Sequence, residues 1–271
     1  MPMMRRTFAT ALLTMFCVGS APGVHASEAD AEREERWQQI ADYIFGDREV
    51  VPTDSLIKID APKRAQDAAL VPITLTMTEK DKIKSVYLVI DENPIPLAAH
   101  VIFGPGADAG ALHLRVRVDT YTNIHAVAET TDGKLFSNAV FVKASGGCSA
   151  PSGPSDVEAM KGMGEMRMKF AENVQQGKPA EATLMIRHPN FSGMQMNQLT
   201  RLYTPPRYVE KVTVSQGDRT VLEVTGDISL STNPAIGFSF VPADQAPIRV
   251  VASDNKGGQW EESFDVPLAT N

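Results

Sequence analysis

The chain has 271 residues, of which 43% are hydrophobic, 22% charged and 7% aromatic. This is the composition of a globular protein, which argues against a disordered, collagen-like or disulfide-rich chain. At roughly 150 residues per domain, the length predicts two domains. The formal net charge of -7 argues against nucleic-acid binding, because neutralising phosphates requires a basic surface.

Residues 1–26 have the features of a secretory signal peptide. Arg5 and Arg6 precede an uncharged apolar stretch at 7–19, and Ala26 ends a small-residue cleavage pattern. That stretch is too short to span a bilayer, and no later segment has 18 consecutive apolar residues. We therefore expect a periplasmic protein that does not insert into the membrane. The arginine pair also fits a twin-arginine signal, but the general secretory route is favoured because two arginines are common in such signals.

Residues 28–45 are predicted to form a helix that ends at Gly46. Its apolar residues recur at helical spacing on an otherwise charged segment. Such a stripe more often packs on its own domain than on a partner. The stripe consists of Trp37, Ile40, Ala41, Ile44 and Phe45.

Both halves of the remaining chain predict β-strands. Short runs of alternating hydrophobicity extend over 56–142 and again over 166–266, separated by turn signals such as Thr131-Asp132-Gly133-Lys134. In the run 112–118 the alternation predicts a buried face of apolar residues and a solvated face that includes Arg117. An all-β chain of two antiparallel sandwiches, with one short N-terminal helix, is the expected fold class.

The two halves are joined by residues 144–155, a run of Gly, Ser, Pro and Ala around Cys148. This composition predicts a flexible Cys-bearing linker. It divides the mature chain into a first domain at 27–143 and a second at 156–271. Since Cys17 lies in the signal peptide, the mature protein carries a single, unpaired thiol, which is unusual in an oxidising compartment.

The neighbours of Cys148 suggest that it is presented to other proteins. Gly146, Gly147 and Ser149 are small and flexible, so we expect a swinging arm with a reach of about 20 Å. No adjacent base or helix N-terminus is predicted to activate the thiol, which argues against an enzyme acting through Cys148. This interpretation requires a sulfur atom that partners can reach.

At these residues the chain resembles the sulfur-oxidation proteins SoxY and SoxZ, fused head to tail. SoxY carries its cysteine in Gly-Gly-Cys-Gly-Gly, and Gly146-Gly147-Cys148 resembles the first half of that motif. The SoxY-like part covers roughly 28–150 and the SoxZ-like part roughly 155–271. SoxZ-like features are His188-Pro189, Ser192-Gly193, Asn233-Pro234 with Phe238 and Phe240, and Asp254-Asn255-Lys256-Gly257.

The resemblance implies two immunoglobulin-like sandwiches that pack on each other, and a non-catalytic carrier without a cofactor. Cys148 would hold a thiosulfonate or persulfide of the thiosulfate oxidation type. Partners would be a c-type cytochrome, a sulfatase-like hydrolase and a molybdenum–haem dehydrogenase. The fusion is also typical of SoxYZ-like carriers associated with PQQ-dependent (quinoprotein) alcohol dehydrogenases. Ser149-Ala150-Pro151 replaces the second Gly-Gly, and the arm is anchored at both ends, so this chain departs from the family pattern at the arm.

Three alternatives stay open. The first is a cysteine-independent module that scaffolds a quinoprotein alcohol dehydrogenase or its cytochrome c. The second is a thiol oxidoreductase, which lacks an activating neighbour. The third is a Cu(I) site at Met160, Met163, Met166 and Met168, although Met166 and Met168 fit a buried strand face better. His113 and His125 are expected on solvated faces, and His188 in a turn or at the domain interface.

Overall fold

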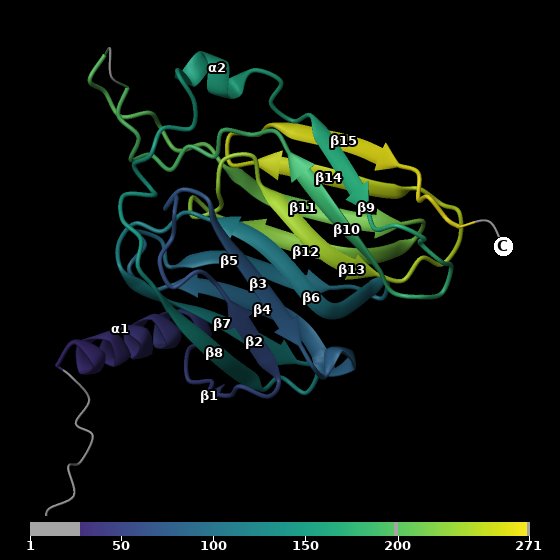
Figure 1. Ribbon diagram of the computed structural model, residues 1–271, viewed down its shortest axis with the longest axis horizontal. Coiled ribbons are helices and arrows are strands. Elements are labelled where there is room, and N and C mark those ends of the chain that lie inside the picture. The colour runs from purple at the N-terminus through teal and green to yellow at the C-terminus, as the bar shows by residue number, and fades with distance from the viewer. Residues whose placement is uncertain (1–27, 198–199, 270–271) are drawn as a thin grey trace, which may run out of the picture.

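A computed structural model describes residues 28–197 and 200–269, so the expected signal peptide lies outside the described residues. The protein is mostly β-structure with one N-terminal helix, and its two sheets, each with strands from both halves of the chain, form two immunoglobulin-like β-sandwiches (Figure 1). The predicted fold class is therefore confirmed. No helix among these residues is long and apolar enough to cross a bilayer.

Helix α1 (Glu28–Phe45) packs on the first sandwich through the predicted stripe. Trp37, Ile40, Ala41 and Phe45 are buried, and the chain leaves the helix at Gly46 with φ of 63°, a conformation that favours glycine. The Trp37 ring stacks on His125, with 3.7 Å between centroids. The prediction that α1 packs on its own domain is confirmed, whereas His125, expected in solvent, is buried because α1 covers that face.

Among the residues that the structure describes, eight strands lie in the first half and seven in the second. The first half contains β1 (Val50–Pro52), β2 (Ile57–Asp60), β3 (Val71–Met77), the 3-10 turn η1 (Lys80–Lys82), β4 (Ile83–Ile90), β5 (Leu97–Phe103), β6 (Ala107–Val116), β7 (Thr122–Thr130) and β8 (Leu135–Val142). The second contains the short helix α2 (Asp156–Met160), β9 (Met166–Phe170), β10 (Ala180–Ile186), β11 (Val209–Gln216), β12 (Arg219–Gly226), β13 (Ala235–Phe240), β14 (Ile248–Asp254) and β15 (Gln259–Phe264).

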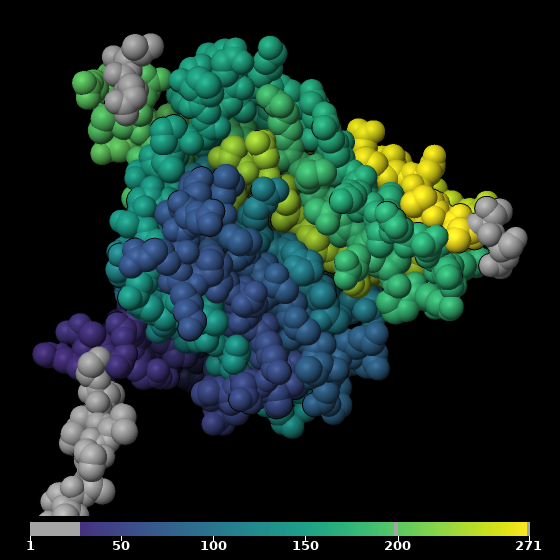
Figure 2. Space-filling view, in the orientation of Figure 1, coloured from purple at the N-terminus to yellow at the C-terminus, as the bar shows by residue number. Residues whose placement is uncertain are grey.

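Strand pairing continues across the boundary between the halves. The larger sheet has the order β1-β8-β7-β4-β5-β12-β11-β14-β15, and the smaller β2-β3-β6-β13-β10-β9. The junctions are β5 with β12, where Val101 faces Val224, and β6 with β13, where Leu112 faces Phe238. One hydrophobic cluster runs through both halves, and their surfaces meet directly in Figure 2. The expected packing of the two halves therefore includes two pairs of hydrogen-bonded strands.

Two local features depart from the predicted antiparallel pattern. Strand β1 pairs in parallel with β8. Helix α2 forms just after the linker, where the Ser155 side chain accepts a hydrogen bond from the Glu158 backbone amide, 3.2 Å. A Ser at this position satisfies an amide that a helix start leaves unpaired, which explains a helix too short to show apolar periodicity.

Candidate functional site

Cys148 lies in the connection between β8 and α2, residues 144–155, which we call the arm. It is a free thiol with none of its surface exposed. The expectation that the sulfur is held out in solvent is therefore wrong for this structure. Cys148 is nevertheless absent from both hydrophobic clusters. It is enclosed at the junction of the arm with the two domains and does not fill an apolar core.

The two glycines before the thiol hold the arm against the first domain. The amide of Gly146 donates to Asp119 O, 2.7 Å, and that of Gly147 to Val118 O, 3.0 Å. A Cβ on Gly147 would lie 2.1 Å from Ala68 O and 2.6 Å from Val118 O, so this position has room only for glycine. Gly146 has φ of 77°, which glycine adopts without strain.

The predicted swinging arm of Gly146, Gly147 and Ser149 is thus docked in the structure. Gly147 allows close packing against the first domain and Gly146 allows a turn. The glycine-rich composition of the arm had predicted only flexibility. Ser149 is exposed, and its hydroxyl closes a local turn by donating to Gly146 O, 3.2 Å. The second domain also holds the arm, because the buried Ser192 hydroxyl donates to the carbonyl of Cys148.

Arg117, directly after β6, connects the arm to both domains. Its guanidinium is completely buried, although the alternation of its strand had predicted a solvated side chain. Nη1 donates to Gly147 O, 3.1 Å, and weakly to Ala150 O, 3.5 Å. The arm and the second domain cover this end of β6, which is why the alternation failed here. No sequence signal distinguished Arg117 from its neighbour Arg115.

Further bonds from Arg117 reach the arm and the second domain. Nη2 donates to Ser152 Oγ, 3.0 Å, to Asn190 O, 3.4 Å, and to the Thr232 hydroxyl. The backbone of Arg117 is fixed in turn by buried Asn93, whose Nδ2 donates to Arg117 O, 2.8 Å. The guanidinium is therefore held in place before any ligand or partner binds.

The surroundings keep the thiol neutral. Burial raises the pKa of Cys148 to about 12, with a further increase from the negative charge of Asp119, while Arg117 opposes the shift. Since the thiolate is the nucleophilic form, the docked thiol is unreactive at neutral pH. Any covalent chemistry at Cys148 requires the arm to open.

The SoxZ-like motifs, distant in the sequence, meet beside the arm. His188 Nδ1 lies 2.7 Å from Asn190 Oδ1 and its Nε2 lies 3.5 Å from Asp254 Oδ2. The His188 amide donates to Asn233 Oδ1, 3.1 Å. His188 is buried within the second domain, and burial, the largest influence, lowers its pKa. This network positions the loop that carries Ser192.

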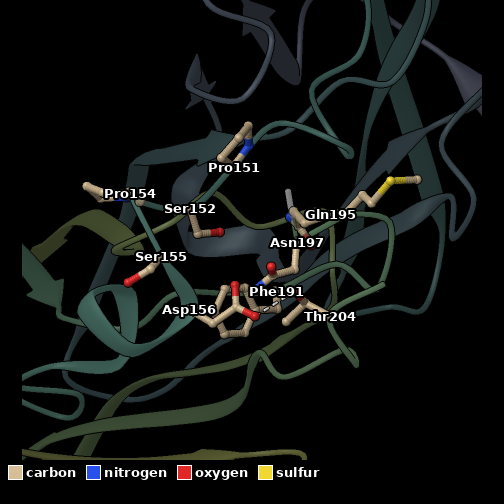
Figure 3. A pocket seen from close by; sticks show the side chains of 11 residues that line it. Pro151, Ser152, Pro154, Ser155, Asp156, Phe191, Gln195, Asn197 and Thr204 are labelled. Carbon is tan, nitrogen blue, oxygen red and sulfur yellow. Dashed lines mark hydrogen bonds between the residues drawn. The ribbon is translucent and has the colours of Figure 1, made fainter. Parts of the chain in front are cut away.

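A pocket with a volume of about 140 Å³ opens beside the arm (Figure 3). Its lining includes Pro151, Ser152, Phe191 and the pair Thr204 and Asp156, in which Thr204 Oγ1 donates to Asp156 Oδ2, 3.0 Å. Cys148 does not line it. The pocket therefore lies beside the second half of the arm and does not reach the thiol.

The remaining predicted candidates are dispersed. Met166 and Met168 belong to or pack on the core, whereas Met160 is exposed on α2. His113 is exposed, as predicted. Across residues 28–197 and 200–269, no three His, Cys, Asp or Glu side chains are grouped to hold a metal ion.

Comparisons with known proteins match the two halves separately. Residues 41–148 match the family "Sulfur oxidation protein SoxY" and residues 167–265 match "Sulphur oxidation protein SoxZ". No curated protein matches the chain.

Similar solved structures include the sulfur carrier protein SoxY from Chlorobium limicola f thiosulfatophilum. It is 23% identical, with a TM-score of 0.37, over 42% of this chain and 96% of that one. A β-glycosidase from Bacteroides vulgatus is 10% identical, with a TM-score of 0.25, over 79% of this chain and 25% of that one. The glucan-utilization protein SGBP-B from Bacteroides ovatus is 16% identical, with a TM-score of 0.23, over 78% and 47%.

The first family match ends within the arm, at Cys148, and the second begins after the arm, at residue 167. The chain therefore joins a SoxY domain and a SoxZ domain in one polypeptide.

Proposed function

We propose that this protein is a periplasmic, non-catalytic sulfur carrier and that Cys148 is its attachment residue. The observation that carries the proposal is the position of the thiol. The SoxY match ends at Cys148, which is the single cysteine of the described residues, and Ser192 of the SoxZ domain binds its carbonyl. Both domains thus contact the residue that would carry the cargo.

Loading with thiosulfate is an oxidation that needs an electron acceptor. The thiol and thiosulfate form a Cys–S–S–SO₃⁻ adduct and release one proton and two electrons, which a c-type cytochrome would accept. Water then releases sulfate from the adduct and leaves a persulfide, the step of a sulfatase-like hydrolase. A molybdenum–haem dehydrogenase would oxidise the remaining sulfane sulfur. In each step the partner supplies the catalysis, because the docked thiol has no activating base.

The carrier would alternate between a docked and an open arm. Opening breaks the hydrogen bonds donated by the backbone amides of Gly146 and Gly147 and those donated by the Arg117 and Ser192 side chains. Each of these hydrogen bonds contributes about 1 kcal/mol net. Local openings of this kind require far less free energy than global unfolding. The docked state would protect the sulfur group between encounters, and the open state would present it to a partner's active site.

Burial of the thiol favours one alternative, a cysteine-independent scaffold for a quinoprotein alcohol dehydrogenase or its cytochrome c. In that case the arm would stay closed, and Cys148 would only help to join the two domains.

The mass of the protein isolated from its native periplasm distinguishes these functions. A carrier is expected to show a reductant-sensitive addition on Cys148 of one sulfur, or of two sulfurs and three oxygens. Cys148→Ser should abolish both the adduct and the pathway that it serves, and Ser149→Ala, on an exposed neighbour, should preserve both. Normal pathway activity in Cys148→Ser, with the protein present at normal levels, would establish the scaffold instead.

A further inference from the structure

Arg117 is a buried cation without a carboxylate counter-ion. Its side chain has no exposed surface, and none of the salt bridges found among residues 28–197 and 200–269 includes it. Its hydrogen-bond acceptors are all neutral backbone carbonyls and hydroxyls. Its Nε hydrogen has no acceptor. A fully buried and uncompensated charge destabilises the fold.

Arg117 binds the arm on both sides of Cys148, and its positive charge acts on the thiol. Its Nη1 contacts the carbonyls of Gly147 and Ala150, which lie on either side of Cys148 in the chain. The nearby acidic groups do not neutralise it, since Asp67 acts on it only at longer range and Asp119 acts on Cys148. The free Nε donor and the long 3.5 Å contact to Ala150 leave capacity for another acceptor. With a neutral thiol in place, the positive charge has no partner.

We propose that Arg117 is the counter-ion of the negatively charged sulfur group carried on Cys148, so that the arm docks more tightly when it carries an anion. The inference rests on the proposed carrier function for the identity of its cargo, a thiosulfonate or persulfide. Arg117 would bind the charge that the cargo adds, and it would retain the loaded arm until a partner with a competing positive site engages it. The guanidinium is already ordered for this role, because Asn190 O and the Thr232 hydroxyl accept its hydrogen bonds and Asn93 fixes the Arg117 backbone carbonyl.

Two adducts made chemically on the purified protein test this without any partner enzyme. Tetrathionate transfers a thiosulfonate to the thiolate and releases thiosulfate, which yields the anionic Cys148–S–S–SO₃⁻. Methyl methanethiosulfonate transfers a methylthio group and releases methanesulfinate, which yields the neutral Cys148–S–S–CH₃. Both forms contain the same disulfide linkage. Their terminal groups differ in charge and also in size.

Docking is measured by amide hydrogen exchange in a peptide that covers residues 144–152, because the amides of Gly146 and Gly147 are protected only when the arm is docked. In the wild type we expect exchange to be about tenfold slower in the anionic form than in the neutral one, the size of effect expected for a close buried charge pair. In Arg117→Gln the two forms should exchange within twofold of each other. Arg117→Lys, which keeps the charge but loses the fork of donors, should retain part of the difference.

In each variant, the exchange rate of the neutral adduct is divided by that of the anionic adduct. Comparing this ratio between variants removes the effect of adduct size and of any general increase in the mobility of the arm. Arg115→Gln is the matched control, because it removes the positive charge of a half-buried arginine two residues away, outside the contacts described for the arm, and should leave the wild-type ratio of exchange rates intact. Circular dichroism and the melting temperature check that Arg117→Gln is folded, and Arg117→Lys provides the test if it is not. An equal ratio in the wild type and in Arg117→Gln, or a ratio near one in the wild type, would overturn the proposal. These results do not depend on whether cells load Cys148, which the native mass measurement decides.

Discussion

Replacing Gly147 with alanine should release the arm. The added Cβ would lie 2.1 Å from Ala68 O and 2.6 Å from Val118 O, far closer than carbon and oxygen atoms can approach. Both oxygens belong to the backbone, so neither can rotate away. Overpacking of this kind costs about 1–3 kcal/mol, and the docked state bears this cost while the open state does not.

The expected consequence is faster reaction of Cys148 with a thiol reagent. A cost of 1–3 kcal/mol corresponds to about a 5- to 150-fold larger opening constant, since 1.4 kcal/mol is a factor of ten. If labelling occurs only from the open state, its rate at pH 7.5 should rise by the same factor. Pseudo-first-order labelling with a chromogenic disulfide measures this rate directly.

Gly146→Ala is the matched control. Its Cβ would meet nothing closer than the Ser149 hydroxyl at 3.8 Å, but its φ of 77° is unfavourable for alanine. A cost of about 1 kcal/mol predicts labelling only about fivefold faster. The reasoning is refuted if Gly147→Ala labels at the wild-type rate, or if wild-type Cys148 already reacts as fast as in denaturant.

Three further predictions concern the arm and its support. Burial raises the pKa of the docked Cys148 thiol to about 12 although Arg117 opposes the shift, so a charge on the thiol sulfur itself, unlike one on the terminal group of the proposed cargo, weakens docking. Docking is therefore fully present below the ordinary thiol pKa of 9.0 and weakens between about pH 9 and 12. The NMR resonances of Gly146 and Gly147 should report this opening, and those of Cys148→Ser should not. Ser192→Ala removes the donor to the Cys148 carbonyl, so labelling should accelerate about fivefold, for about 1 kcal/mol, and an unchanged rate would show that this bond contributes nothing. Trp37→Ala removes the ring that stacks on His125 beneath α1 and should lower the free energy of unfolding, measured in urea, by about 3–5 kcal/mol. The rate at which Cys148 is labelled under native conditions should not change. A change in that rate would mean that α1 and the arm are coupled.

The docked arm changes how a carrier with two anchored ends can work. A terminal arm has one attached end, whereas residues 144–155 are attached to β8 on one side and continue into α2 on the other. The reachable volume of such a loop is small, so opening matters more than swinging. Protection by docking and access by opening then become separate steps. Under the proposed role of Arg117, the charge on the cargo would favour the docked state.

Local patterns in the sequence determined the secondary structure, the packing stripe of α1 and the single thiol between two sandwiches. Those features depend on residues close together in the chain, where periodicity and turn chemistry act directly. The sheets that run through both domains, the burial of Cys148 and the loss of the solvated face at Arg117 and His125 were decided only by tertiary structure. Each depends on a surface supplied from far along the chain: α1 over His125, β12 and β13 beside β5 and β6, and the SoxZ domain with the arm over Arg117. The alternation of residues along one strand does not show which distant segment will cover that strand. A glycine that is needed for a tight backbone contact also cannot be distinguished, in the sequence, from a glycine that is needed for flexibility.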